Sequence, residues 1–382
     1  AFCQPHEGID LRYLFYLLMG DRHRLVEQGQ GGTQLNISQT ILKAHEVPVA
    51  PIGEQERIVS KLDELFSRID EGERALEQVS KLVERYRQSV LKAAVTGELT
   101  RDWRAARKAR GEPVESGEAL LARILTARRQ AWEKAELAKM KAKGIKPAND
   151  NWKKKYKEPE AIVTDCLEAL PDSWQRVRVD AVGEVQLGRQ RSPAHHDGEH
   201  MRPYLRVANV YEERIDLSDV MRMNFTPDEF ATYALRDGDI LLNEGQSKEL
   251  VGRPAIYRNN LPGSCFTNTL VRFRATEAVL PAFAMIVFLH YMKSGHFQNI
   301  AKITTNIAHL GAGRFAEMVF PVPSIEEQKE IVERVEKQNS VYRHLLDDLK
   351  QRKGAVSALR QSVLREAFSG RLVSQDSTEE SA

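Results

Sequence analysis

Polar side chains that can hydrogen-bond to the base edges of a nucleic acid lie in glycine-containing segments of the C-terminal half of the chain. Arg and Lys pair with guanine and Asn and Gln with adenine, while Ser, Thr and backbone amides hold phosphates. Each residue alone is an ordinary surface type, so the signal is their clustering, which is strongest in residues 245–248 and 304–309. The candidate DNA-binding residues are Arg189, Gln190, Arg191, Asn209, Asn243, Gln246, Ser247, Lys248, Thr304, Thr305, Asn306, His309 and Arg314.

No motif of a common enzyme class occurs in the sequence. It contains no phosphate-binding G-x-x-x-x-G-K-[ST] loop, glycine-rich nucleotide fingerprint, H-E-x-x-H pair or Asn/Asp-Pro-Pro-aromatic motif. His195, His196, Asp197 and His200 are neighbours in sequence, but their spacing fits no standard zinc pattern and the stretch is rich in turn formers. We therefore expect no catalytic residue, metal or cofactor, and an exposed polar loop at these histidines.

Composition limits the class of protein. The 382 residues are enough for two or three domains, and 29% charged with 42% hydrophobic residues is ordinary for a globular protein. Apolar runs such as residues 14–19 are far shorter than the ~20 residues of a membrane-spanning helix. Cys3, Cys166 and Cys265 are too far apart to predict a zinc knuckle or a disulfide framework, which favours a reducing, cytoplasmic setting and no membrane partner.

The positive charge of the chain is concentrated in one segment. Residues 101–157 contain 17 Lys and Arg against 7 Asp and Glu, whereas residues 171–320 contain 17 of each. Such a basic segment is either a solvated helical face or connector, or a surface that contacts phosphates. The neutrality of residues 171–320 argues against tight DNA binding by that part alone, because phosphate neutralisation supplies much of the affinity.

An internal repeat organises the chain. Residues 48–99 align without a gap with residues 321–372, at an offset of 273, and 19 of the 52 positions are identical. Both copies have an apolar side chain every three or four residues, which is typical of a coiled coil. We therefore expect helices at 54–95 and 327–368, each roughly 60 Å long, packed against each other antiparallel. The expected coiled-coil seam is Ile58, Leu62, Leu65, Ile69, Leu76, Val79, Val83, Tyr86, Val90, Ile331, Val335, Tyr342, Leu345, Leu349, Val356, Leu359 and Val363.

The repeat continues weakly upstream of the helices. At the same offset, residues 13–17 align with 286–290, and 31–38 with 304–311. Residues 1–47 are therefore expected to be the C-terminal remnant of a domain whose complete copy is 170–320, so that the counterpart of residue 170 would lie about 103 positions before residue 1.

The sequence pattern of the complete copy predicts both strands and helices, and so an α+β fold. Alternating or β-rich runs occur at residues 176–182, 204–210, 239–242, 253–257 and 269–273, and helical patterns at 227–234 and 281–291. The expected domains are 1–47, the first remnant; 48–100, the first helical repeat; 101–169, a basic linker; 170–320, the complete domain; 321–372, the second helical repeat; and 373–382, a disordered tail.

Blocks in this order resemble one known family, the specificity subunits of Type I restriction-modification systems. Residues 48–59 (PVAPIGEQERIV) and 85–100 (RYRQSVLKAAVTGELT) are similar to the family's helical repeats. Residues 170–174 (LPDSW), 237–242 (DGDILL), 251–255 (VGRPA) and 305–310 (TNIAHL) are similar to its target-recognition domains. The chain departs from the family at its front, where only the second recognition domain is whole.

The resemblance implies a non-catalytic reader of a bipartite DNA sequence, with two recognition domains joined by an antiparallel helical spacer. It also implies partners: double-stranded DNA, adenine methyltransferase (modification) subunits carrying S-adenosylmethionine, and ATP-driven restriction subunits. Two alternatives stay open from the residues alone. One is a free-standing sequence-specific DNA-binding regulator, and the other is a coiled-coil scaffold that does not bind DNA.

Overall fold

The computed structural model describes residues 5–29, 36–113, 115–142, 144–147, 149–160, 162, 169–304 and 306–374. Two compact units share this chain: residues up to 85 with those from 341 onward form the first, and residues 86–340 form the second. The candidate Thr305 and residues 375–382 of the expected tail lie outside the described residues. Within the described residues, no helix combines the length and apolarity needed to cross a membrane.

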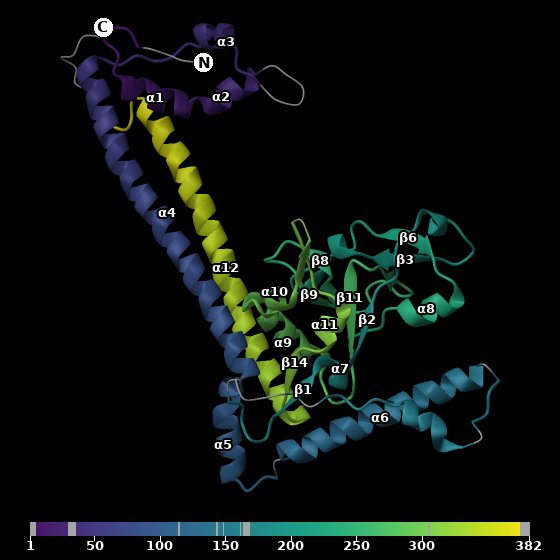
Figure 1. The fold of residues 1–382 in the computed structure, drawn as a ribbon. Helices are drawn as coiled ribbons and strands as arrows, with labels where there is room; N and C mark the ends of the chain where they lie inside the picture. The colour runs from purple at the N-terminus through teal and green to yellow at the C-terminus, as the bar shows by residue number, and fades with distance from the viewer. Residues whose placement is uncertain are drawn as a thin grey trace. The chain divides into compact units, whose positions relative to one another are not determined.

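Two helices of 44 residues each, α4 (Ile52–Val95) and α12 (Ile325–Phe368), correspond to the two sequence repeats. They pack against each other with opposite directions (Figure 1). In the first unit, Ile58 and Leu62 near the start of α4 share a buried cluster with Leu364 and Ala367 near the end of α12. The equivalent residues in the second unit, Ile331 and Val335 with Leu91 and Ala94, share another. This confirms the predicted antiparallel helical pair.

Polar contacts in the middle of the pair fix its register. The Tyr342 hydroxyl donates to the Glu84 carboxylate at 2.8 Å, and the Lys353 ammonium lies 3.2 Å from the Glu77 carboxylate. Val83, Tyr342 and Leu349 form a small buried cluster between them.

Four residues of the expected seam are exposed instead of buried: Val79, Tyr86, Leu345 and Leu359. A pair of helices covers only a narrow stripe of each partner. The second copy also places the polar residues Gln338 and Arg352 at seam positions. Tyr86 accordingly donates its hydroxyl hydrogen to Gln338 Oε1 at 2.7 Å.

A fully buried glutamine in each long helix holds the start of another helix. Gln328 Oε1 accepts from the Leu280 N–H at 2.8 Å, and its Nε2 donates to the Ala278 and Pro323 carbonyls at 2.9 and 3.0 Å. Leu280 is the N-cap of α9 (Pro281–Lys293), so this amide joins α9 to α12.

Gln55 makes the same set of contacts in the first unit. Its Oε1 accepts from the Asp10 N–H at 2.8 Å, and its Nε2 donates to the Gly8 and Ala50 carbonyls at 3.1 and 2.7 Å. Asp10 is the N-cap of α1 (Leu11–Gly20). The residue numbers of Asp10 and Leu280 differ by 270, whereas the offset of the sequence repeat is 273. α1 therefore corresponds to α9 with a shift of three residues from the alignment of residues 13–17 with 286–290.

The domain of mixed strands and helices is built on α9. Its central sheet has the order β2-β11-β7-β9, with all neighbours antiparallel. Phe288 of α9 lies 5.0 Å, centroid to centroid, from Phe273 of β11. The strands are β2 (Gly183–Leu187), β7 (Ile240–Asn243), β9 (Pro254–Ile256) and β11 (Leu270–Ala275).

Smaller sheets flank this core. β1 (Gln175–Arg178) pairs with β14 (Val319–Val322), and β10 (Cys265–Phe266), β3 (Met201–Leu205) and β6 (Met221–Asn224) form a second sheet. The strand expected at 176–182 ends early, because its last four residues form α7 (Val179–Val182). The strand expected at 204–210 is likewise interrupted by a short helix, η4 (Val207–Asn209).

The remaining elements are short helices and strands, with one long exception, α6. The helices are α2 (Arg22–Glu27), α3 (Gln39–Ala44), η1 (Glu98–Thr100), α5 (Arg101–Ala109), α6 (Gly117–Ala142), η2 (Asp150–Lys155), η3 (Pro193–His195), α8 (Pro227–Tyr233), α10 (His296–Ile300) and α11 (Ala312–Ala316). The strands are β4 (Val210–Tyr211), β5 (Arg214–Ile215), β8 (Gly245–Gln246), β12 (Lys302–Thr304) and β13 (Ile307–His309).

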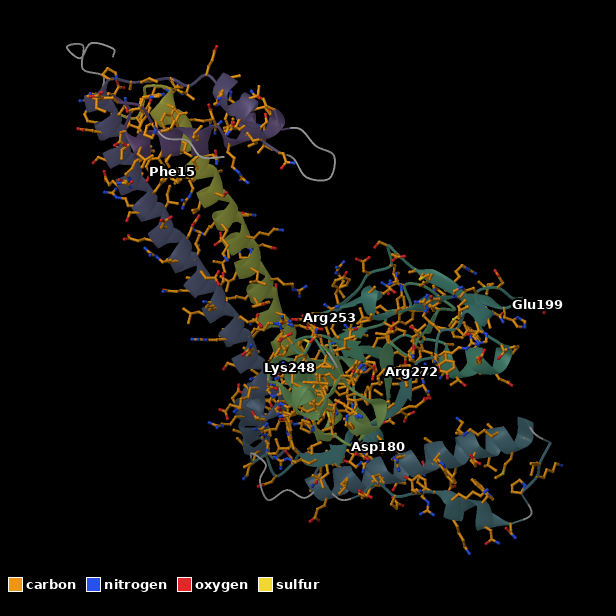
Figure 2. The ribbon with its side chains drawn as sticks, turned by 45° about the horizontal axis from the view of Figure 1, so that its top comes forward. Phe15, Asp180, Glu199, Lys248, Arg253 and Arg272 are labelled. Atoms are coloured by element: carbon orange, nitrogen blue, oxygen red, sulfur yellow. The ribbon has the colours of Figure 1, made fainter. Side chains whose placement is uncertain are left out.

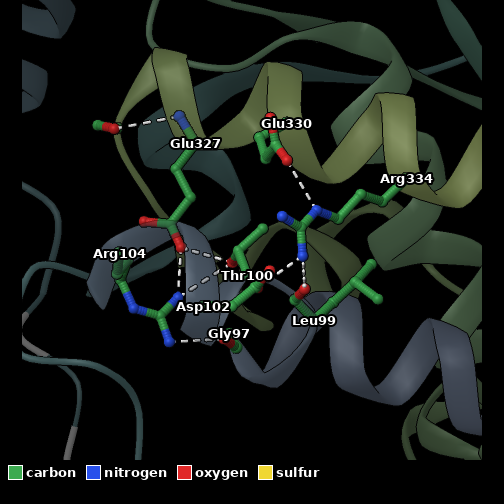
Figure 3. A network of polar contacts seen from close by, with 9 residues as sticks. Gly97, Leu99, Thr100, Asp102, Arg104, Glu327, Glu330 and Arg334 are labelled. Atoms are coloured by element: carbon green, nitrogen blue, oxygen red, sulfur yellow. Dashed lines mark hydrogen bonds and ion pairs between the residues drawn. The ribbon is translucent and has the colours of Figure 1, made fainter. Parts of the chain in front are cut away.

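A network of charges joins the end of α4 to the start of α12 (Figure 3). The carboxylate of Glu327, which is buried, accepts from the Thr100 hydroxyl at 2.7 Å and pairs with Arg104. Arg334 donates to the Leu99 carbonyl at 2.8 Å and to the Asp102 carboxylate at 2.6 Å. The Arg334 guanidinium lowers the pKa of the Asp102 carboxyl. These contacts hold η1 and α5 against α12.

Replacing the buried glutamine of the second repeat should destabilise the fold. Gln328→Ala leaves the Leu280 N–H and two carbonyls without partners, so we expect the free energy of unfolding to fall by about 2–3 kcal/mol. Urea unfolding measures the change. Gln361→Ala, at an exposed glutamine of the same helix, is the matched control and should change it by about 0.5 kcal/mol or less. Equal unfolding midpoints for the two variants would contradict the role of this amide.

Candidate nucleic-acid interface

The two segments with the strongest clustering of polar residues meet in one three-stranded sheet. β8 pairs with β13, and β13 pairs with β12, in the order β12-β13-β8. Gln246 lies opposite Ala308 in this sheet, and Gly245 lies opposite His309. We call β12, Asn306, β13 and β8 together the ribbon.

The β12–β13 hairpin of the ribbon is largely exposed. All three residues of β12 are exposed, as is Asn306 in the turn. Cross-strand pairing of Lys302 with His309 and of Thr304 with Ile307 places these four side chains on one face. A two-stranded ribbon fits the major groove of B-DNA, so this face could present polar groups to base edges.

Two isoleucines on the hairpin are exposed as well, Ile303 by 54% and Ile307 by 49%. Exposed isoleucines on a polar hairpin can contact the thymine methyl group. Lys302, Ile303 and Ile307 are not among the predicted candidates. Their signal in the sequence is the alternation of polar and apolar residues in Lys-Ile-Thr at 302–304.

Hydrogen bonds at the base of the ribbon hold it to the central sheet. Glu244 links β7 to β8, and its carboxylate lies 3.0 Å from His309 Nδ1. Its carbonyl accepts from the Leu310 N–H at 2.8 Å, and its own N–H donates to Thr269 at 2.9 Å. The exposed Arg314 donates to the His309 carbonyl at 2.7 Å.

The residues that follow β8 continue the same edge. The Ser247 N–H donates to Gln246 Oε1 at 3.0 Å, and Lys248 is exposed. Figure 2 labels Lys248 and Arg253 at this part of the domain, with Glu199 at the far end, where β3 and β6 lie. The Arg253 guanidinium lies over the Tyr211 ring, 4.9 Å from its centroid.

A second group of candidates lies beside β3. Gln190 and Arg191 are exposed, and the Arg191 guanidinium lies 5.7 Å from the centroid of the Tyr204 ring. Figure 1 places β3 away from β8, so these two residues belong to a different part of the surface from the ribbon.

Three candidates have buried side chains with internal partners. Arg189 pairs with Glu229 at 2.7 Å and lies over the Phe225 ring. Asn209 Nδ2 donates to the Asp216 and Asp219 carbonyls at 3.0 and 2.9 Å. Asn243 Nδ2 donates to the Val210 carbonyl at 3.4 Å. In this structure these residues hold loops in place and are not accessible to a ligand.

Two sequence blocks that support the resemblance also have structural roles. In the DGDILL block, the buried Asp239 carboxylate pairs with Arg274 through two contacts of 2.7 Å. In the VGRPA block, Gly252 has a φ of +73°, and a Cβ there would lie 2.3 Å from the Phe297 ring.

Outside these blocks, the buried Arg272, labelled in Figure 2, pairs with Glu184 at 2.7 Å, and burial lowers the pKa of Arg272.

Among the described residues, no group of three or more His, Cys, Asp and Glu side chains is arranged to hold a metal ion. His195, in η3, is half-buried, whereas His196, Asp197 and His200 are exposed.

Comparisons with known proteins agree on one family. The sequence model of the "Type I restriction modification DNA specificity domain" matches residues 3–80 and 171–349. The specificity subunit of the Type I restriction enzyme EcoKI of Escherichia coli K12 is 24% identical over 93% of this chain, and that of EcoBI of Escherichia coli is 26% identical over 95%. The chain spans 63% and 66% of the length of these two relatives.

The fold has a counterpart among solved structures. A chain in a structure of a type I R-M system, concerned with complex assembly and conformational transition, aligns with a TM-score of 0.62 at 16% identity. The alignment covers 96% of this chain and 72% of that one. By the match of the family's sequence model to most of its length, this chain belongs to the family of Type I restriction-modification DNA specificity proteins.

Proposed function

We propose that this protein is a non-catalytic DNA-specificity subunit of a Type I restriction-modification complex, and that residues 170–320 read one half-site of a bipartite target. The observation that carries the proposal is the ribbon. It pairs β8 with the largely exposed β12–β13 hairpin, within the part of the chain that the family's sequence model matches. The exposed candidates Gln190 and Arg191 would form a second contact region.

The charge of the reading domain supports a dependence on partners. Residues 171–320 carry 17 basic and 17 acidic residues, so the domain has no net charge with which to neutralise phosphates. Base contacts supply specificity, but phosphate contacts supply much of the affinity. In the proposal, adenine methyltransferase subunits docked on α4 and α12 provide the missing contacts and the methyl transfer, and restriction subunits join the larger assembly.

The helical pair gives the proposal its geometry. In each unit, an apolar cluster and a buried glutamine hold the ends of α4 and α12 that lie there, and in the proposal this helical pair is the spacer between the half-sites. Rigid spacers set the separation of half-sites in other DNA readers. A scaffold without DNA binding would account for the helical pair, but it would leave the exposed β12–β13 hairpin without a role.

Substitutions on the ribbon should relax the target sequence. Asn306→Ala and Thr304→Ala remove groups that we place at base edges, so each should cost the assembled complex about 1–3 kcal/mol in binding its target and relax one position of it. Sequencing of methylated sites in host DNA reports the position, and titration of a target duplex reports the affinity. Asn260→Ala, at an exposed asparagine outside the ribbon, is the control. Unchanged methylation sites in both ribbon variants would contradict this map of the reading surface.

The protein should bind DNA tightly only with its partners. Because the reading domain is neutral, we expect the full-length protein alone to bind duplexes weakly and salt-dependently, and the complex with methyltransferase subunits to bind its target tightly and specifically. Fluorescence anisotropy with random and target duplexes, with and without those subunits, measures this. Nanomolar specific binding by the chain alone at physiological salt would favour the free-standing regulator.

A further inference from the structure

Residues 132–157, which we call the basic arm, form a strongly cationic part of the second unit that the family's sequence model does not match. The arm contains nine lysines and three acidic residues, a net charge of +6, and no arginine. It consists of the second half of α6 and the segment that returns through η2. One of its lysines, Lys143, lies outside the described residues.

The arm is anchored to the recognition domain through the first half of α6. Leu120 and Ile124 are buried in the same apolar cluster as Trp174. Arg128 Nε donates to the Asp180 carbonyl of α7 at 3.1 Å, and its Nη1 donates to the Lys157 carbonyl at 3.0 Å. Figure 1 shows α6 leaving the neighbourhood of β1 and α7 and extending beyond them.

Aromatic stacking holds the returning segment against α6. The Trp132 ring stacks on the Trp152 ring with centroids 5.9 Å apart, and Tyr156 lies 5.4 Å from Trp132. Arg128 donates to the Tyr156 hydroxyl at 3.0 Å. Trp152 is buried, so the aromatic groups of the arm form its interior and the lysines form its surface.

The acidic residues of the arm are already paired within it or at its base. Glu133 lies 3.5 Å from Arg129 and 3.7 Å from Lys153, Glu136 lies 3.8 Å from Lys139, and Asp150 lies 3.4 Å from Lys153. The other described lysines are exposed, and no described carboxylate lies within 4 Å of their ammonium groups. They are Lys134, Lys141, Lys146, Lys154, Lys155 and Lys157.

We propose that the basic arm is a phosphate-binding arm that contacts the backbone of the DNA duplex. This inference rests on the proposed function, because it supplies the recognition domain with the positive charge that the domain lacks. Lysine is a compact point charge that suits phosphate, and the arm lacks the planar guanidinium of arginine, whose fork favours bidentate recognition. The role proposed for the arm is affinity for the duplex, while the reading of bases is assigned to the ribbon.

The composition of the arm favours DNA over a protein partner. Protein interfaces are depleted in lysine and are centred on exposed aromatic anchors, whereas here the tryptophans are packed together and the lysines face solvent. The reach also suits a duplex. From Leu120 to Ala142, α6 rises about 33 Å at 1.5 Å per residue. One turn of B-DNA is about 34 Å long, so the arm can reach phosphates about one turn away from its anchor.

The test compares two full-length variants that lose the same charge. The arm variant carries Lys→Gln changes at Lys141, Lys146, Lys154 and Lys155, and the control variant carries them at the exposed Lys43, Lys329, Lys337 and Lys350. Binding to a random-sequence duplex is measured by anisotropy across a salt series. Loss of four phosphate contacts should lower the slope of log affinity against log salt by about three to four, whereas loss of net charge alone should change it little.

A second measurement does not depend on substitutions. The wild-type protein is acetylated with and without the random duplex, and mass spectrometry compares Lys154 and Lys155 with Lys337. Protection of the arm lysines together with the reduced slope supports the proposal. Equal slopes for the two variants, no binding by the wild type at low salt, or an arm variant that loses only its methyltransferase subunits would each overturn it.

The two proposals fail separately in these experiments. A random duplex needs no knowledge of the target, so the arm's contribution is measured without the ribbon. Unchanged methylation sites in the ribbon variants would contradict the proposed reading surface. A reduced slope of log affinity against log salt in the arm variant would still support the phosphate-binding arm.

Discussion

Two buried side-chain amides, those of Gln55 and Gln328, attach the long helices α4 and α12 to the helices α1 and α9. Gln328 accepts one hydrogen bond and donates two, and in doing so it fixes the first turn of α9 and the entry into α12 together. Only a side chain with both a donor and an acceptor at its end can do this, which excludes Glu, Lys and Met. α9 in turn underlies β11, β11 pairs with β7, and β7 leads through Glu244 to the ribbon. The position of the proposed reading surface therefore depends on an interaction on the far side of the core.

The helices could be predicted from the sequence because their apolar period extends over forty residues and occurs twice. The residues that the structure buries most deeply, Ile58 and Leu62 with Ile331 and Val335, are among those on which the period depends. Other features could not be predicted. The three-residue shift between α1 and α9 lies upstream of the ungapped repeat, and the exposure of Val79 and Leu345 depends on how little of each helix its partner covers.

The candidate site illustrates a different limit of sequence reasoning. Polar residues beside glycines serve two purposes, since they either close turns or face a ligand, and both uses favour the same residue types. Asn209 and Asn306 are both asparagines in polar segments, yet one donates to two carbonyls inside a loop and the other is exposed in a hairpin turn. What separates them is strand pairing between residues about sixty positions apart, which short-range patterns do not encode.

The two buried glutamines, Gln55 and Gln328, attach their domains to the long helices in nearly the same way. Gln55 and Gln328 hold their helices through equivalent atoms, and the leucine and alanine that complete each end, Leu91 and Ala94 or Leu364 and Ala367, come from the same repeated sequence. Each glutamine binds only backbone groups, one N–H and two carbonyls, and none of them depends on the side chains of the strands. Sequence changes in the strands are therefore compatible with an unchanged attachment to the long helix.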